Sequence, residues 1–320
     1  MTAKPKVLVT RRWPGAVEAK LSELYDVTLN ASDEAMAPEA IRAALDAYDA
    51  VCPTVTDKIT AEVIGRPARA KVLGNFGVGF NHIDIDAAKA AGLTVTNTPG
   101  VLTDATADIA LTLLLNVCRR TFEGETMLRR GDWTGWRPTQ LMGVGPQGKT
   151  LGIIGMGRIG KAMAKRCHHA LDMAVVFYDA FPVADPGVPA EQLPSVEAVL
   201  ERSDIVSLHC PGGGENIHLM NAERLARMKP GAILVNSARG DIIDEAALVA
   251  ALESGHLGGA GLDVFEREPA VTEALKAMGN VCLLPHLGSA TRETREAMGM
   301  TVLDNLAAVF EGREPPNRVA

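Results

Sequence analysis

Three polar side chains in the second half of the chain could together carry out chemistry on a carbonyl group. Arg239, Glu268 and His286 each stand shortly after an apolar run that predicts a β-strand. Ligands of open parallel sheets bind at the carboxyl ends of the strands. A cation polarises a carbonyl and holds a carboxylate, a histidine protonates the developing alkoxide, and a carboxylate orients that histidine. Each residue alone has a common structural explanation, but together they predict acid catalysis on a 2-keto acid that receives a hydride.

A glycine-rich turn upstream offers a site for the hydride donor. Gly155, Gly157 and Gly160 form a G-x-G-x-x-G motif between an apolar strand and a helical stretch over residues 161–170. In such a motif the first glycine permits a tight turn, the second lets the backbone approach a pyrophosphate, and the third allows close packing of helix on strand. The free N–H groups at the helix N-terminus then face the phosphates. The motif therefore predicts a dinucleotide site.

The next strand indicates which dinucleotide binds. It ends in Asp179, 19 residues beyond Gly160. A carboxylate at this point accepts hydrogen bonds from ribose hydroxyls and repels a 2′-phosphate. Residues 179–182 contain no arginine that could hold such a phosphate. We therefore expect NAD(H) in preference to NADP(H).

A second glycine cluster, over residues 74–79, also lies between a predicted strand and a helix. It lacks the third glycine of the dinucleotide motif, and the strand predicted after it, over residues 94–97, ends without a carboxylate. We reject it as the dinucleotide site. Its backbone N–H groups can still bind a small anion, as glycine-rich turns do.

Composition narrows the class of protein. A chain of 320 residues with 47% hydrophobic and 22% charged residues predicts a globular protein of two domains. The formal net charge of −7, without a long basic run, argues against nucleic acid and membrane partners. Five scattered cysteines indicate reduced thiols and no metal site. With no signal-peptide core or membrane span in the sequence, we expect a cytoplasmic protein.

Alternation of β-rich runs with helical patterns predicts an α/β protein with parallel sheets. One long apolar helix is expected over residues 103–128, and an irregular segment over 131–148 contains Trp133 and Trp136. That segment is equally explained as a self-packed loop or as a cover for a neighbouring domain or subunit. Strands are expected near residues 6–10, 25–29, 50–55, 71–75, 94–97, 150–154, 174–178, 204–208, 232–235, 261–264 and 281–284.

Motifs along essentially the whole chain resemble the D-isomer-specific 2-hydroxyacid dehydrogenases, in particular their glyoxylate/hydroxypyruvate reductase (glycerate dehydrogenase) branch. The resemblance implies two Rossmann-like doubly wound parallel-sheet domains with the active site in the cleft between them. Residues 1–99 and 288–320 would form the substrate-binding domain, and residues 100–287 the NAD-binding domain. The motifs are Gly77–Asp84, Leu102–Asp108, Leu151–Gly160, Asn236–Gly240, Leu262–Phe265 and Pro285–Thr291.

The resemblance also implies roles for individual residues. Arg239, Glu268 and His286 would be the catalytic set, and the N–H groups of Val78 and Gly79 would hold the substrate carboxylate together with Arg239. Residues implied to contact the cofactor, in addition to the three motif glycines and Asp179, are Thr106, Arg158, Ile159, Cys210, Pro211, Ser237, Asp263 (through the nicotinamide carboxamide), His286 and Gly288. The family is usually dimeric through its coenzyme domain, which favours the interface explanation of the tryptophan segment.

Two departures from the family pattern stand out. Asn81 occupies a position that is commonly Asp, and Gly212–Gly214 replace a segment that usually carries Leu and a later Thr. The glycines put cofactor contacts beyond Pro211 in doubt.

From these observations we expect an NADH-dependent reductase that converts glyoxylate to glycolate and hydroxypyruvate to D-glycerate, with His286 as general acid. A dehydrogenase for a bulkier 2-keto acid, such as phenylpyruvate or 2-ketogluconate, is the alternative within the same chemistry. An NAD-sensing binding protein of the same fold is the alternative from another class, which the absence of long polar tails disfavours.

Overall fold

The computed structural model describes residues 3–320, which form two compact units. The first unit includes the N-terminal part as far as Leu102 together with Ala290–Ala320, and the second is Thr103–Ser289. Each unit is a parallel sheet covered by helices on both faces. The predicted fold class is therefore confirmed: there are two parallel-sheet α/β domains, and the chain leaves the first to build the second and then returns.

The first unit contains a five-stranded sheet in the order β2-β1-β3-β4-β5. All of its strand pairs are parallel. Each connection between parallel strands must cross over a face, which places helices on both sides of the sheet. The strands are β1 (Lys6–Val9), β2 (Asp26–Leu29), β3 (Ala50–Cys52), β4 (Val72–Gly74) and β5 (Thr94–Thr96).

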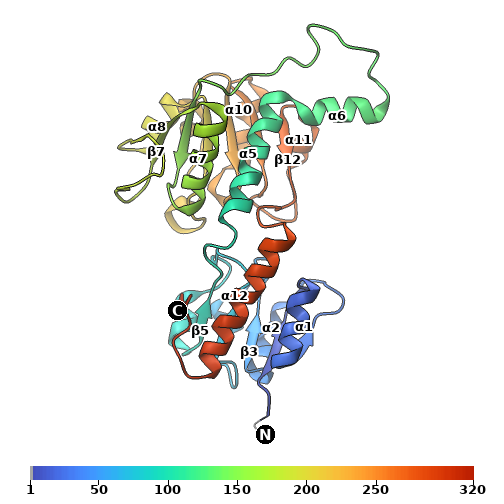
Figure 1. The fold of residues 1–320 in the computed structure, drawn as a ribbon, viewed down its shortest axis with the longest axis vertical. Coiled ribbons are helices and arrows are strands. Elements are labelled where there is room, and N and C mark those ends of the chain that lie inside the picture. Colours follow the sequence, from blue (N-terminus) through green and yellow to red (C-terminus); the bar gives the residue numbers. More distant parts are fainter. Residues whose placement is uncertain (1–2) are drawn as a thin grey trace. The chain divides into compact units, whose positions relative to one another are not determined.

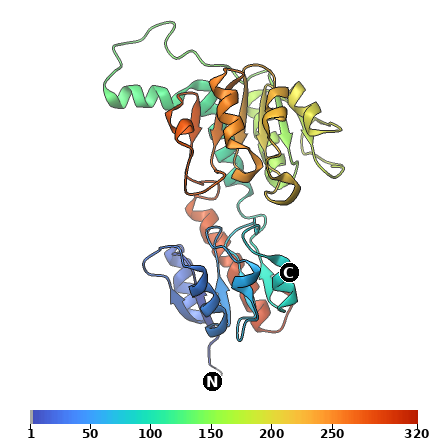
Figure 2. The same ribbon diagram turned by 180° about the vertical axis from the view of Figure 1, so that it is seen from behind.

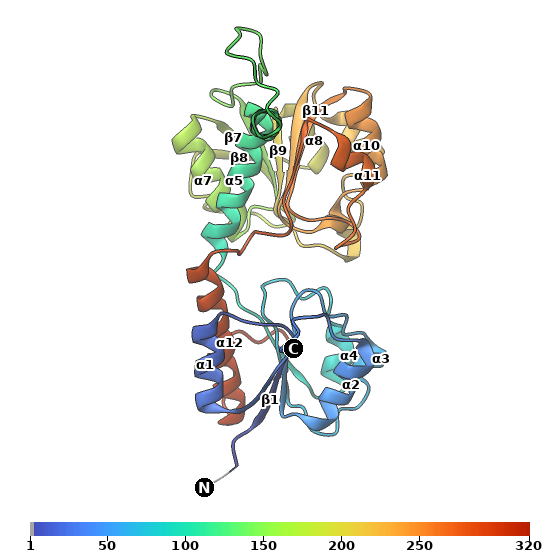
Figure 3. The same ribbon diagram turned by 90° about the vertical axis from the view of Figure 1, so that its right-hand side faces the viewer.

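Two separate apolar layers hold this unit together. Helices α1 (Gly15–Leu24) and α12 (Arg292–Phe310) cover one face of the sheet, where they contribute Leu21 and Leu306 to the core. Helices α2 (Pro38–Ala47), α3 (Ala61–Ile64) and α4 (Ile85–Ala90) cover the other face (Figure 3). The C-terminus runs beside β5, where the Val95 N–H donates to the Ala320 carbonyl at 2.9 Å.

The second unit contains a seven-stranded sheet in the order β12-β11-β10-β9-β6-β7-β8. Chain order reverses between β6 and β9, which makes this the switch point where doubly wound sheets bind ligands. The strands are β6 (Thr150–Ile154), β7 (Ala174–Tyr178), β8 (Ala190–Gln192), β9 (Ile205–Leu208), β10 (Ala232–Asn236), β11 (Leu257–Leu262) and β12 (Val281–Leu283).

Helices sandwich this second sheet as well. Helices α5 (Thr103–Arg119) and α7 (Arg158–Leu171) lie on one face. The opposite face carries α8 (Val196–Arg202), α9 (Ala222–Arg227), α10 (Glu245–Glu253) and α11 (Glu273–Ala277). Two short 3₁₀ turns, η1 (Gly214–Asn216) and η2 (Gly240–Ile242), lie near the carboxyl ends of β9 and β10. None of the helices in the described part of the chain has the length and hydropathy that a membrane crossing requires.

The prediction of one long helix over residues 103–128 is wrong. Helix α5 ends at Arg119, and Arg120 adopts a left-handed conformation with φ of 52° before α6 (Thr121–Arg130) begins. No proline stands between the two helices, so residue types alone did not mark the break. Helix α6 and the segment that follows it extend away from the rest of the second unit (Figures 1 and 2).

Strand β11 begins four residues earlier than expected, and β8 was not anticipated. The sequence Leu-Gly-Gly-Ala-Gly-Leu of β11 is poor in the β-branched residues that favour strands. Its glycines serve close packing instead, since a Cβ on Gly261 would lie 2.8 Å from the Leu113 Cβ of α5. Close approach of α5 thus explains a strand that propensity disfavours.

Candidate functional site

The predicted glycine turn has the geometry that a dinucleotide-binding loop requires. Gly155 has a φ of 93°, and a Cβ there would lie 2.6 Å from the backbone nitrogen of Cys210. A Cβ on Gly160 would lie 2.2 Å from the carbonyl oxygen of Gly155, so this glycine lets α7 pack against the turn. A Cβ on Gly157 would meet nothing within 4 Å, which leaves the backbone open to a ligand. The three glycines therefore have the three separate roles that the motif predicts.

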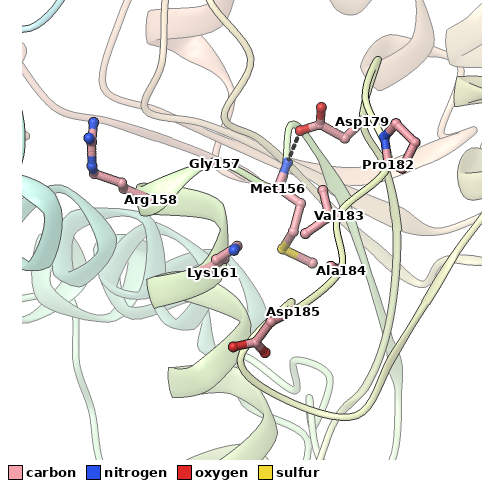
Figure 4. A pocket seen from close by; sticks show the side chains of 9 residues that line it. All are labelled: Met156, Gly157, Arg158, Lys161, Asp179, Pro182, Val183, Ala184 and Asp185. Carbon is pink, nitrogen blue, oxygen red and sulfur yellow. Dashed lines mark hydrogen bonds between the residues drawn. The ribbon is translucent and has the colours of Figure 1, made fainter.

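Asp179 lies beside this turn at the carboxyl end of β7. Its carboxylate accepts the N–H groups of Met156 at 2.8 Å and Phe181 at 3.1 Å. These bonds fix the carboxylate at the edge of a pocket that Gly157, Arg158 and Lys161 also line (Figure 4). The pocket combines a carboxylate, the open end of a helix and two cations. That donor set matches the adenosine and pyrophosphate parts of a dinucleotide.

Further features of the second unit fit a dinucleotide cofactor. Gly157 is the N-cap of α7, and it has no side chain to cap the N–H groups of the first turn. The Ser237 hydroxyl is buried without a partner in the described chain, as expected for a group that awaits a ligand. Thr106 is buried, and its hydroxyl donates to the Gly288 carbonyl at 3.1 Å. The other implied cofactor residues lie on the first turn of α7 (Arg158 and Ile159) and directly after β9 (Cys210 and Pro211).

His286 and Glu268 form the hydrogen-bonded pair that the catalytic prediction requires. The distance between His286 Nδ1 and Glu268 Oε2 is 2.9 Å. The other carboxylate oxygen of Glu268 accepts the Phe265 N–H at 3.0 Å. Glu268 is thus held from two sides and presents a fixed acceptor to the imidazole. This arrangement leaves Nε2 as the imidazole nitrogen that can deliver a proton.

Arg239 stands close enough to the pair to influence its charge. Burial raises the pKa of the Glu268 carboxyl, but the hydrogen bond and charge of His286, the Phe265 N–H and the charge of Arg239 together lower it overall. Burial lowers the pKa of the Arg239 guanidinium, because it disfavours the charged form. The negative charges of Glu268 and Asp241 act in the opposite direction and raise it. Glu268 therefore stays ionised at neutral pH. The three predicted catalytic residues are brought together at one edge of the second sheet.

Asp263 anchors the loop that carries His286. One carboxylate oxygen accepts the Leu287 N–H at 2.6 Å, the other accepts the Gly288 N–H at 2.7 Å, and the Asp263 carbonyl accepts the His286 N–H at 2.9 Å. Burial raises the pKa of Asp263, an effect that the Leu287 and Gly288 amides and the charge of His286 partly offset. His286 has a φ of 54°, a left-handed conformation that residues other than glycine adopt mainly where the surrounding structure imposes it. The implied contact of Asp263 with a nicotinamide carboxamide stays a prediction.

The second glycine cluster, in the first unit, has a backbone suited to an anion. The Asn75 side chain donates to the carbonyls of Gly77 at 3.1 Å and Gly79 at 3.0 Å, and Asn97 donates to the Val78 carbonyl at 2.9 Å. Within the described residues, the N–H groups of Val78 and Gly79 donate to no other group. The carbonyls of residues 77–79 are thus bonded to side-chain amides, while the N–H groups of Val78 and Gly79 remain available for a ligand. Sequence reasoning found the turn but missed Asn75, whose buried side chain organises it.

The fold and the site define a dinucleotide-binding oxidoreductase. Residues 111–288 match the family described as D-isomer specific 2-hydroxyacid dehydrogenase, NAD binding domain. The chain is 42% identical to a glyoxylate reductase from Thermococcus litoralis over 99% of this chain and 97% of that one. This protein belongs to the D-isomer-specific 2-hydroxyacid dehydrogenases, as the motifs predict.

Solved structures agree with this assignment. The TT0316 protein from Thermus thermophilus superimposes with a TM-score of 0.90 at 46% identity, covering 98% of this chain and 100% of that one. An NADPH-dependent glyoxylate/hydroxypyruvate reductase from Sinorhizobium meliloti superimposes with a TM-score of 0.89 at 35% identity, covering 99% and 97% of the two chains. Because that relative uses NADPH, membership of the family does not decide between the two nicotinamide cofactors.

We expect the half-buried His209, which follows β9 beside the glycine turn, to make the stability of the protein sensitive to acid. Burial lowers the pKa of His209 to about 4 from its ordinary 6.5, and its Nε2 contacts the Ser207 hydroxyl at 2.9 Å. Between pH 6.5 and pH 4, His209 is therefore protonated in the unfolded chain and neutral in the folded chain. The free energy of unfolding therefore falls as the pH drops from 6.5 to 4, by up to about 3 kcal/mol for this group.

We expect His209→Gln to lose less stability than the wild type between pH 7 and pH 4.5, measured by urea unfolding at both values. The matched control is His169→Gln, because His169 is exposed on α7. This control should lose as much stability as the wild type. Equal losses in all three proteins would contradict the assignment.

Proposed function

We propose that this enzyme reduces glyoxylate to glycolate and hydroxypyruvate to D-glycerate, with NADH as the electron donor and His286 as the general acid. The observation that carries the proposal is the 2.9 Å bond between His286 Nδ1 and Glu268, at the sheet edge that also carries Arg239. A histidine paired in this way can hold a proton for a developing alkoxide. The nicotinamide, when bound, supplies the hydride.

The chain's own residues position the keto acid and stabilise the charge that develops on it. In this proposal the guanidinium of Arg239 binds the carbonyl oxygen and one carboxylate oxygen of the substrate. In the first unit, the N–H groups of Val78 and Gly79 are proposed to bind a carboxylate, because they have no acceptor within the described chain. As the carbonyl oxygen gains negative charge, the Arg239 cation stabilises it more strongly than in the ground state.

Proton transfer completes the reaction at the same oxygen. His286 donates its Nε2 proton to the alkoxide, and Glu268 stabilises the cationic imidazole before transfer and fixes its orientation. The lowered pKa of Glu268 keeps this carboxylate ionised while the histidine carries its proton. Asp263 keeps the loop in place during the step through its bonds to Leu287 and Gly288.

We expect the purified wild type to oxidise NADH rapidly with glyoxylate and hydroxypyruvate, and more slowly with pyruvate and phenylpyruvate. His286→Ala should lower kcat by about 10²–10⁴-fold, the usual contribution of general acid catalysis, while NADH binding measured by fluorescence is retained. Glu268→Gln keeps the size and a hydrogen-bond acceptor but loses the charge, so it should retain more activity than His286→Ala. Near-full turnover by His286→Ala would exclude His286 as the acid.

The preference for NADH over NADPH rests on Asp179. Its carboxylate is held by Met156 and Phe181, so it cannot swing away from a 2′-phosphate without breaking those bonds. Asp179→Ser should therefore shift the ratio of kcat/KM for the two cofactors toward NADPH by about tenfold or more, as expected for one charged contact. An unchanged ratio would show that Asp179 does not face the ribose.

We further propose that the enzyme is a homodimer formed through α6 and the segment 131–148. Helix α6 buries none of its residues, although an isolated helix of ten residues is marginal in water. Phe122, Leu128, Trp133 and Trp136 are exposed, Trp136 to 80%. Helix α6 and the segment after it project from the second unit (Figure 1). Large apolar side chains on such an element are typical of subunit interfaces, and a second copy would supply the missing partner surface.

Combined Leu128→Glu and Trp136→Glu substitutions should convert the dimer to a monomer in analytical ultracentrifugation, because both charges would be buried without partners. Leu24→Glu is the matched control, since Leu24 is 40% exposed on α1 of the other unit. The control should remain dimeric. A wild type that sediments as a monomer would refute the interface.

A further inference from the structure

Gly212, the first of three successive glycines, lies directly against the stem of Arg239. A Cβ on Gly212 would lie 2.7 Å from the Cβ of Arg239 and 2.8 Å from its Cγ. Real Cβ atoms do not approach other heavy atoms this closely, so any side chain at this position would displace Arg239 or the turn. The backbone of Gly212 therefore occupies one side of the space through which the arginine side chain leaves the main chain.

Asp241 holds this turn in place. Its Oδ2 accepts the Gly213 N–H at 2.8 Å, and its backbone carbonyl accepts the His218 N–H at 2.8 Å. Gly213 and Gly214 have φ values of 79° and 54°, a region that favours glycine. The segment 213–218 is thus attached to Asp241 at both of its ends and could not follow this path with ordinary residues.

Contacts from the opposite side make the Arg239 backbone rigid. The Asn236 side chain donates to the Arg239 carbonyl at 2.8 Å. A Cβ on Gly240 would lie 1.9 Å from the backbone carbonyl carbon of Phe265, so η2 packs tightly on the loop that leads to Glu268. With the main chain fixed in this way, the remaining freedom of Arg239 lies in its side-chain torsions. Gly212 restricts the first of these torsions.

The second carboxylate oxygen of Asp241, Oδ1, accepts no hydrogen bond from the described chain. This oxygen is buried, and it would lie 2.4 Å from a Cβ on Gly212. Residue 212 must therefore lack a side chain for the carboxylate to reach Gly213. The glycine and the aspartate form one packing unit with the arginine stem.

We propose that Asp241 and Gly212 are positioning residues that set the direction of the Arg239 side chain. The inference rests on the proposed role of Arg239 in binding the keto acid. It assigns a function to the glycines, which replace larger residues of the family pattern. Because small misplacements of a substrate-binding group can reduce catalysis by about 10²-fold, the effect should appear in substrate kinetics.

Two variants test the proposal. Gly212→Ala introduces the Cβ that Arg239 must avoid, and Asp241→Ala releases the Gly213 N–H. Both should raise KM for glyoxylate by about tenfold or more and lower kcat/KM by about 10²-fold. The Kd for NADH and the Tm should stay close to wild type. Asp241→Asn keeps an acceptor for Gly213 and should recover most of the activity that Asp241→Ala loses.

Gly214→Asn is the matched control. A Cβ there would meet nothing within 4 Å, and asparagine tolerates the φ of 54°. Its KM should match that of the wild type. The proposal is overturned if Gly212→Ala leaves KM unchanged, if NADH affinity falls as much as substrate affinity, or if Asp241→Asn is as impaired as Asp241→Ala.

A crystal structure of Gly212→Ala separates this proposal from the proposed function. A displaced Arg239 side chain supports the positioning role even if the wild type reduces none of the keto acids tested. An unmoved Arg239 overturns the positioning role even if the wild type is an active glyoxylate reductase. If the wild type binds NADH tightly but reduces none of the four keto acids, that result would count against the proposed function alone.

Discussion

The buried carboxylate of Asp263 is the interaction on which the site depends. Its two oxygens accept the amides of Leu287 and Gly288, and its carbonyl accepts the amide of His286. These three bonds hold His286 in a left-handed conformation that its side chain would otherwise avoid. In that conformation His286 Nδ1 lies 2.9 Å from Glu268 Oε2. A charge taken out of water at the end of β11 is thus compensated by backbone donors, which in turn position the histidine.

Parallel strands explain why residues far apart in sequence meet. Arg239 follows β10, Glu268 lies in the loop after β11, and His286 lies in the loop after β12. These three strands are neighbours in the sheet, so their carboxyl ends lie along one edge. The glycine turn after β6 and Asp179 after β7 lie along the same edge, beyond β9. One sheet therefore carries both the glycine turn and the proposed catalytic set, at the edge where doubly wound sheets bind ligands.

Close backbone packing at glycines is the second organising feature. Gly160 brings α7 against the turn after β6, and Gly261 brings α5 against β11. Gly240 does the same between η2 and the loop that carries Glu268. In each case a Cβ would lie closer to its neighbour than atoms in folded proteins pack. Tight packing of this kind limits the movement of neighbouring residues, including Arg239 and Asp241 on either side of Gly240.

The sequence by itself determined the α/β class and the glycine turn between β6 and α7, and it predicted Arg239, Glu268 and His286 as the catalytic set, because these depend on local spacing and on residue type. It did not show the break at Arg120, since no proline marks it and the left-handed conformation there is not a feature of residue type. Nor could it show that Asn75 orders the anion-binding turn, or that Asp241 and Gly212 pack on Arg239. Those contacts join separate segments, so only the tertiary structure decided them. Local patterns specify elements and chemistry, whereas long-range packing specifies where each side chain points.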